Sequence, residues 1–248
     1  MTDAAFQSFT DGAYRGLVRL ARDRYPFLSF TDAASASAGV LWRHDIDVSV
    51  HRALALARIE HDLGVRATYF VHVHSAFYNT FEDAIATRLR AIAGLGHEIG
   101  VHFDPHFYGL APEGGAALSR AVAAEAAAIA ALVNSRVVAV SFHDPDKHGG
   151  TVAADDEIAG LVSACGRTIR EQFGYCSDSN GYWRFASLGD ELASGSHERL
   201  QVLTHPEWWV PEPMSPRQRI ARAIDGRAAA VAAGYDAALT ALGRENLR

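Results

Sequence analysis

The chain has 248 residues, of which 49% are hydrophobic and 21% are charged, as in an ordinary soluble globular protein, so extensive disorder is not expected. The formal net charge is −6 and Lys147 is the single lysine, which excludes a basic surface for nucleic acid or an anionic membrane. The first residues lack the pattern of a signal peptide, and we expect no membrane span and a cytoplasmic location. Cys165 and Cys176 indicate free thiols, with a single bridge as the alternative.

The hydrophobic pattern predicts helices that alternate with strands. Thr10 and Ser49 have the residue types of N-terminal helix caps. In chain order the predicted elements are a helix over 11–25, a strand from 39 that ends at Asp45 and Asp47, a helix over 49–62, a strand over 67–73, a helix over 81–93, a strand over 96–103, a helix over 116–133, a strand over 137–142, a helix around 155–164, a strand end with a turn over 174–184, a strand over 199–205 and a helix over 216–242.

This alternation is typical of a parallel sheet or barrel. Only five or six segments have a convincing strand pattern, so we predict an α/β fold with a distorted or incomplete (β/α) barrel instead of a regular eight-stranded one. We expect one domain over 1–248, with an N-terminal helical extension over 1–38, the barrel over 39–210 and a C-terminal helix over 216–242.

Polar residues follow several predicted strands, and in such folds the chemistry lies at the carboxyl ends of the strands. His102 and His106 are four residues apart, so one helical turn at this point would place both imidazoles on one metal ion. Such a pair also arises by chance among 12 histidines. The carboxylates of Asp45 and Asp47, at the end of another strand, supply the further ligand that a metal site needs.

With these residues in view, the chain resembles the polysaccharide deacetylase superfamily, the NodB-like metal-dependent amide and ester hydrolases, over about residues 40–209. The segment from Asp45 to Asp47 resembles the first motif in the Asp-x-Asp form of a divergent branch. The segment 96–106, with His102 and His106, is the strongest match, and 203–205 resembles the last motif. These motifs occur in the order that the superfamily has.

The resemblance implies that Asp47, His102 and His106 bind one divalent ion, Zn²⁺ in the first place and Co²⁺, Ni²⁺ or Fe²⁺ as alternatives. It implies that Asp45 is the catalytic base and His205 the general acid. The expected activity is hydrolysis of an acyl group, N-acetyl in the first place, from a sugar or glycan precursor by metal-activated water.

Four residues are weaker candidates for substrate binding or for tuning the base. The superfamily's arginine motif after the fourth strand is replaced by a segment that contains His143, so His143 or Arg184 is expected to take its role. The resemblance also suggests Asp178 as an acidic partner, and Trp208 is either an acyl or sugar contact or a core aromatic. We discount His72 and His44 as core histidines.

Three other functions are alternatives. Asp45 and Asp47 also match the nucleophile motif of haloacid-dehalogenase phosphatases, but the single lysine lies in an unsuitable loop. A glycosyltransferase would leave the histidines without a role. The more serious alternative is a metal-containing barrel that binds glycans or regulates a partner without turnover. The substrate, the amide or ester specificity and the oligomeric state do not follow from the sequence.

Overall fold

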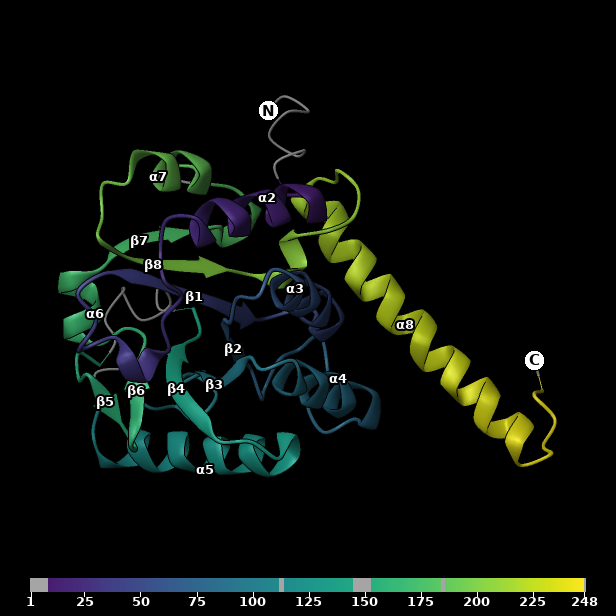
Figure 1. The fold of residues 1–248 in the computed structure, drawn as a ribbon. Coiled ribbons are helices and arrows are strands. Elements are labelled where there is room, and N and C mark those ends of the chain that lie inside the picture. The colour runs from purple at the N-terminus through teal and green to yellow at the C-terminus, as the bar shows by residue number, and fades with distance from the viewer. Residues whose placement is uncertain (1–8, 112–113, 145–152, 184–185, 248) are drawn as a thin grey trace.

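The computed structural model describes residues 9–111, 114–144, 153–183 and 186–247, and within them the chain forms an eight-stranded sheet surrounded by helices (Figure 1). The strands are β1 (Gly39–Ile46), β2 (Thr68–Val71), β3 (Glu98–Phe103), β4 (Val137–Phe142), β5 (Glu157–Ile158), β6 (Leu161–Ser163), β7 (Gly174–Ser177) and β8 (Arg199–Thr204). The spatial order is β5-β6-β4-β3-β2-β1-β8-β7. Neighbouring strands are parallel except for β5 and β6, so most carboxyl ends lie at one edge of the sheet.

The sheet does not close into a complete barrel. Among the described residues, the two edge strands β5 and β7 have no hydrogen-bonded partner on their outer sides. A second cluster of buried apolar side chains, which includes Leu41, Phe70 and Phe173, is separate from the main core between strands and helices. The predicted distorted or incomplete barrel is therefore confirmed, although the sheet has more strands than the sequence pattern indicated.

The helices mostly agree with the hydrophobic pattern. They are α2 (Asp11–Arg22), α3 (Val50–Asp62), α4 (Asp83–Gly94), α5 (Ala116–Val133), α6 (Arg167–Gln172), α7 (Leu188–Ser194) and α8 (Pro216–Ala241), with short 3₁₀ helices η1 (Phe30–Asp32), η3 (Ser179–Gly181) and η4 (Pro206–Trp208). The side chains of Thr10 and Ser49 accept hydrogen bonds from backbone N–H groups in the first turns of α2 and α3. Both predicted caps are confirmed.

The predicted helix around 155–164 is wrong, because this segment forms the antiparallel strands β5 and β6. Between them, Ala159 and Gly160 have φ angles of 53° and 77°. A two-residue turn with positive φ at both positions matches the twist of a hairpin. The turn at Ala159 and Gly160 therefore produces a hairpin where a helix was predicted.

Helix α5 has 18 residues and is long and apolar enough to cross a membrane, judged by length and composition alone. Its buried residues include Leu118, Val122, Ile129 and Val133, and it packs against β3 and β4. The helix therefore packs one apolar face against the sheet.

A buried polar network fixes β1 against the helices. Glu60 of α3 is fully buried, and its Oε1 lies 2.6 Å from Nε2 of His44. Tyr69 donates to Glu60 Oε2 at 2.7 Å, and Nδ1 of His44 lies 2.7 Å from the hydroxyl oxygen of Thr204. His44 thus points away from the face that carries Asp45, as the alternation of β1 requires.

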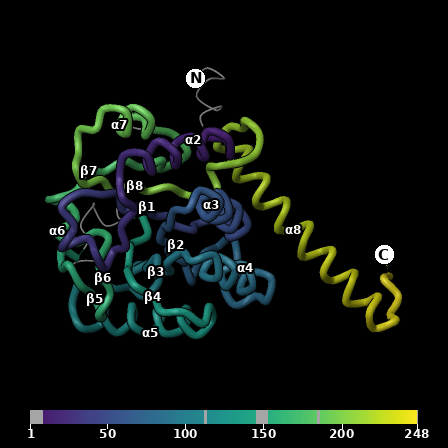
Figure 2. Tube along the Cα trace, viewed as in Figure 1, coloured from purple at the N-terminus to yellow at the C-terminus, as the bar shows by residue number. Residues whose placement is uncertain are grey.

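Helix α8 differs from the other helices in its position. Its first part lies beside η4, and the rest runs away from the sheet and the other helices (Figures 1 and 2). Both cysteines, Cys165 and Cys176, are free thiols, as expected.

Candidate metal and catalytic site

The site begins on β1, whose alternation directs one set of side chains into the barrel. Arg43 and Asp45 are two residues apart and lie on the same face of the strand, and Asp47 follows the end of the strand. On β3, Gly100 lets the ring of Phe70 pack directly against the backbone, because a Cβ atom at this position would clash with the ring at 2.5 Å. His102 lies two residues further along β3, on the same face as Gly100.

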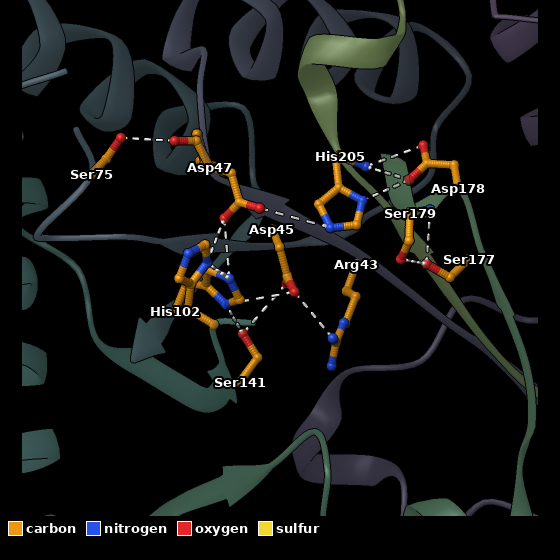
Figure 3. Close-up of polar contacts among 12 residues, drawn as sticks. Arg43, Asp45, Asp47, Ser75, His102, Ser141, Ser177, Asp178, Ser179 and His205 are labelled. Carbon is orange, nitrogen blue, oxygen red and sulfur yellow. Dashed lines mark hydrogen bonds and ion pairs between the residues drawn. The ribbon is translucent and has the colours of Figure 1, made fainter. Parts of the chain in front are cut away.

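Three ligand-type atoms meet at the carboxyl ends of the strands. Oδ1 of Asp47 lies 3.1 Å from Nε2 of His102 (Figure 3). The same oxygen lies 3.2 Å from Nδ1 of His143. The two imidazole nitrogens are themselves 3.1 Å apart. His72, which follows β2, joins Asp47 and His143 in a group whose ligand atoms lie within 4.8 Å of one another.

These atoms fit a divalent ion. Two donors at about 2.0–2.1 Å from a tetrahedral ion lie about 3.3 Å apart, close to the separations found here. Within the described part of the chain, Nε2 of His72 is buried and has no hydrogen-bond partner, whereas Oδ1 of Asp47, also buried, contacts the two imidazole nitrogens. Buried polar atoms are rarely left unsatisfied, so an ion at this point would satisfy Nε2 of His72.

The charges of the cluster suit a cation. Burial alone would raise the pKa of Asp47. Hydrogen bonds from His102 and His143, and the charges of His102 and His205, outweigh burial and hold this pKa well below the ordinary range. Burial, together with the neighbouring imidazoles, lowers the pKa of His72 to about 3. Asp47 is therefore ionised and His72 neutral at neutral pH, which are the forms that bind metals.

His106 is not brought to this cluster. β3 continues through Phe103, and the chain then enters a turn in which His106 is exposed, so no helical turn aligns it with His102. Near Asp47 the structure instead places His143 and His72. His143 was expected to tune the base, and His72 was discounted as a core residue. A sequence signal for His72 exists, because it directly follows β2 as Asp47 follows β1.

Asp45 has an arginine partner that the sequence argument missed. Nη2 of Arg43 donates to Oδ2 of Asp45 at 3.1 Å, and both side chains are almost completely buried. Nδ1 of His102 lies 3.5 Å from the same oxygen and 2.7 Å from the hydroxyl oxygen of Ser141. Arg43 thus makes the contact with Asp45 that was expected of His143 or Arg184. Arg184 lies outside the described residues.

His205 is held by a buried carboxylate. Its Nδ1 donates to Oδ1 of Asp178 at 2.7 Å, and its backbone N–H donates to the same oxygen at 3.0 Å. Trp209 donates its indole N–H to the other oxygen of Asp178 at 2.8 Å. Burial alone would lower the pKa of His205. The hydrogen bond with Asp178 and the negative charges of Asp178 and Asp47 outweigh burial and raise this pKa to about 10. The ring is therefore protonated at neutral pH, and its Nε2 lies 3.9 Å from Oδ2 of Asp47.

A cavity of about 620 Å³ opens onto the site. Its lining includes Asp45, Asp47, His102, His143 and His205, so five of the candidate residues share one space.

Other walls of the cavity come from the edge strand β7, from the residue before it and from η4. Tyr175 lies on β7, Phe173 directly precedes it, and Trp208 contributes from η4. Trp209 is instead a core residue, whose ring centroid lies 5.0 Å from that of Tyr14. Of the two tryptophans, Trp208 is therefore the one placed to touch a substrate.

Glu207 is a further buried carboxyl group at this cavity. Burial and the charge of Asp47 raise its pKa well above the ordinary range. Its position directly after Pro206 gave no periodic signal, and only the tertiary structure places it here.

The chain is similar to several solved structures. They include a mutant of a CE4 family pseudoenzyme with restored enzymatic activity (14% identity, TM-score 0.47, 76% of this chain and 61% of that one). A second is a family 4 carbohydrate esterase from Streptomyces lividans (18% identity, TM-score 0.41, 77% of this chain and 90% of that one). A third is the chitin deacetylase of Colletotrichum lindemuthianum (15% identity, TM-score 0.42, 76% of this chain and 81% of that one). The chain thus spans less than two thirds of the first of these proteins.

By their names, these neighbours are a family 4 carbohydrate esterase, a CE4 family pseudoenzyme mutant and a chitin deacetylase. No family model matches the sequence, and no curated protein matches it.

Proposed function

We propose that this protein is a metal-dependent hydrolase that removes an acyl group, N-acetyl in the first place, from a sugar or glycan precursor. The observation that carries the proposal is the cluster of Asp47, His102 and His143, whose ligand atoms lie 3.1–3.2 Å apart beside a buried carboxylate and a protonated histidine. Each of these groups has a separate place in acyl hydrolysis.

Asp47, His102 and His143 would hold the ion, with His72 beside them. Bound there, a divalent ion would polarise the acyl carbonyl and lower the pKa of water. Nδ1 of His102 contacts Ser141, which fixes the ring and leaves Nε2 directed at the cluster. Zn²⁺ suits this mixture of imidazole and carboxylate donors, as do Co²⁺, Ni²⁺ and Fe²⁺.

Asp45 is placed to accept the proton of the attacking water. It lines the cavity, and the charge of Arg43 keeps its carboxylate fixed through one oxygen. Ser141 approaches the other oxygen at 3.4 Å. Two oriented contacts reduce the number of conformations of the base, which favours proton transfer in a defined direction.

His205 is placed to protonate the departing amine or alcohol. Asp178 holds the ring through Nδ1, so Nε2 faces the cavity and carries the proton that the leaving group needs. The raised pKa keeps this proton on the ring at neutral pH. Trp208 at the cavity wall offers an apolar face for an acyl methyl group or a sugar ring.

The test is release of acetate from acetylated amino sugars and sugar esters by protein reconstituted with Zn²⁺ or Co²⁺. Asp45→Asn and His205→Gln should retain the metal and lose about 100- to 10,000-fold in rate, the usual contribution of general acid–base groups. Unchanged turnover in either variant would refute the assigned roles. Metal binding and sugar binding without turnover in the wild type would support the non-catalytic alternative.

A further inference from the structure

The outer half of α8 lacks packing within the described chain. The helix runs from Pro216 to Ala241, and beyond Arg227 all of its residues are exposed except Leu239, which is half-buried. Figures 1 and 2 show this half extending away from every other element. Helices of about 14 residues are marginal in water without tertiary contacts, and Gly234 weakens this one further. The outer half is therefore expected to have a packing partner.

The exposed residues of α8 are not evenly distributed around the helix. Val231 and Tyr235 are 54% and 63% exposed, although both are large and apolar. They belong to a stripe with the alternating spacing of four and three residues that defines a coiled-coil seam. The members of the stripe, all exposed, are Ile224, Ala228, Val231, Tyr235, Ala238 and Leu242.

We propose that this stripe is a dimer interface, and that its occupant is α8 of a second copy of the chain in antiparallel orientation. The antiparallel seam is self-complementary in size. Ile224 lies opposite the partner's Leu242, and Val231 lies opposite the partner's Tyr235. Ala228 lies opposite the partner's Ala238, which lets the helices approach closely between the larger pairs.

The charges of α8 select the antiparallel orientation. Its first half carries four arginines and one aspartate, whereas its outer half up to Ala241 carries Asp236 as its single charged residue. A parallel pair would place the two arginine-rich halves side by side. In the antiparallel register Arg227 lies opposite the partner's Leu239, and Arg217, Arg219 and Arg222 lie beyond the end of the partner's helix at Ala241, so the two arginine-rich halves are kept apart.

The size of the seam sets the expected strength. From Ile224 to Leu242 it is about 27 Å long at 1.5 Å per residue. Two such stripes bury on the order of 1,000 Å², near the lower limit for a specific interface, so we expect a dissociation constant in the micromolar range. The proposal concerns a surface remote from the metal site and does not depend on the chemistry there.

Sedimentation of the full chain over about 1–200 µM tests the dimer. The wild type should reach twice 26.7 kDa. Val231→Glu places a charge inside the seam and should raise the dissociation constant about 100-fold or more. Ala233→Glu is the matched control, because residue 233 is exposed on the opposite side of the same helix, and it should dimerise like the wild type.

Oxidative cross-linking tests the orientation. A mixture of Ala228→Cys and Ala238→Cys chains should give a disulfide-linked dimer, whereas Ala228→Cys alone should not. Efficient cross-linking of Ala228→Cys alone would indicate a parallel pair and overturn the proposed register. A wild type that stays monomeric up to 200 µM, or that binds lipid vesicles through α8 as a monomer, would overturn the proposal.

Discussion

Replacing Asp178 by asparagine should remove the charge that keeps His205 protonated. In the folded protein, Asp178 accepts a hydrogen bond from His205 and lies beside it as a negative charge. These two effects outweigh burial and raise the pKa of His205 from 6.5 to about 10. That span corresponds to about 5 kcal/mol of preference for the protonated ring. Without the carboxylate, burial remains as the largest influence, so the pKa should fall by several pH units.

The raised pKa of His205 also makes the free energy of unfolding depend on pH. The folded pKa of His205 lies above its unfolded value, so its contribution is fully present below about pH 6.5 and is lost as the pH rises to about 10. Asp178→Asn should therefore lower the free energy of unfolding more at pH 6 than at pH 10. Asparagine also has one acceptor oxygen, whereas the N–H groups of Trp209 and of the His205 backbone use two. The unpaired N–H group should destabilise the variant by about a further 1–3 kcal/mol at either pH.

The assay is an NMR titration of the His205 ring in metal-free protein, with the signal assigned through its loss in His205→Gln. The wild type should titrate near pH 10 and Asp178→Asn far lower. Asp190→Asn changes an exposed aspartate and serves as the control, which should leave the titration unchanged. A wild-type midpoint near 6.5, or equal midpoints in wild type and Asp178→Asn, would refute the reasoning.

Three further changes test other parts of the structure. His143→Ala should abolish binding of one divalent ion per chain, measured by mass spectrometry, whereas His106→Ala should retain it because that side chain lies outside the cluster. Arg43→Met should lower the free energy of unfolding by about 3–5 kcal/mol in denaturant, because it leaves the buried carboxylate of Asp45 without its counter-ion. Burial raises the pKa of Glu125 to about 7, so its charged form is unfavourable in the folded state, and Glu125→Gln should add about 3 kcal/mol of stability at pH 8 but none at pH 4.

Each of these has an outcome that would contradict it. Metal lost in His106→Ala but kept in His143→Ala would restore the ligand set implied by the motifs. Arg170→Met, at an exposed position on the same cavity, is the control for Arg43, and an equal loss of stability in both would show that the ion pair is not the cause. For Glu125→Gln, an equal gain at both pH values would exclude ionisation as its origin.

The sequence alone indicated six of the eight strands, most of the helices and the strand-end positions of several polar residues that now line one cavity. Alternating apolar residues and chain order predicted the parallel strands, since periodicity is a local property. The positions of Asp45, Asp47 and His102 at strand ends followed from the same pattern. The hairpin at 157–163 was not predicted, because two residues with positive φ decided it against the local composition.

What the tertiary structure decided is the set of partners around these residues. His106 is four residues from His102 in sequence, but the strand continues past His102 and the turn directs the chain elsewhere. His72 and His143 come from two other strand ends, and Arg43 reaches Asp45 because both lie on the same face of β1. Sequence patterns specify which face of an element a residue occupies, whereas distances between elements depend on packing of the whole chain, and the composition of the site depends on those distances.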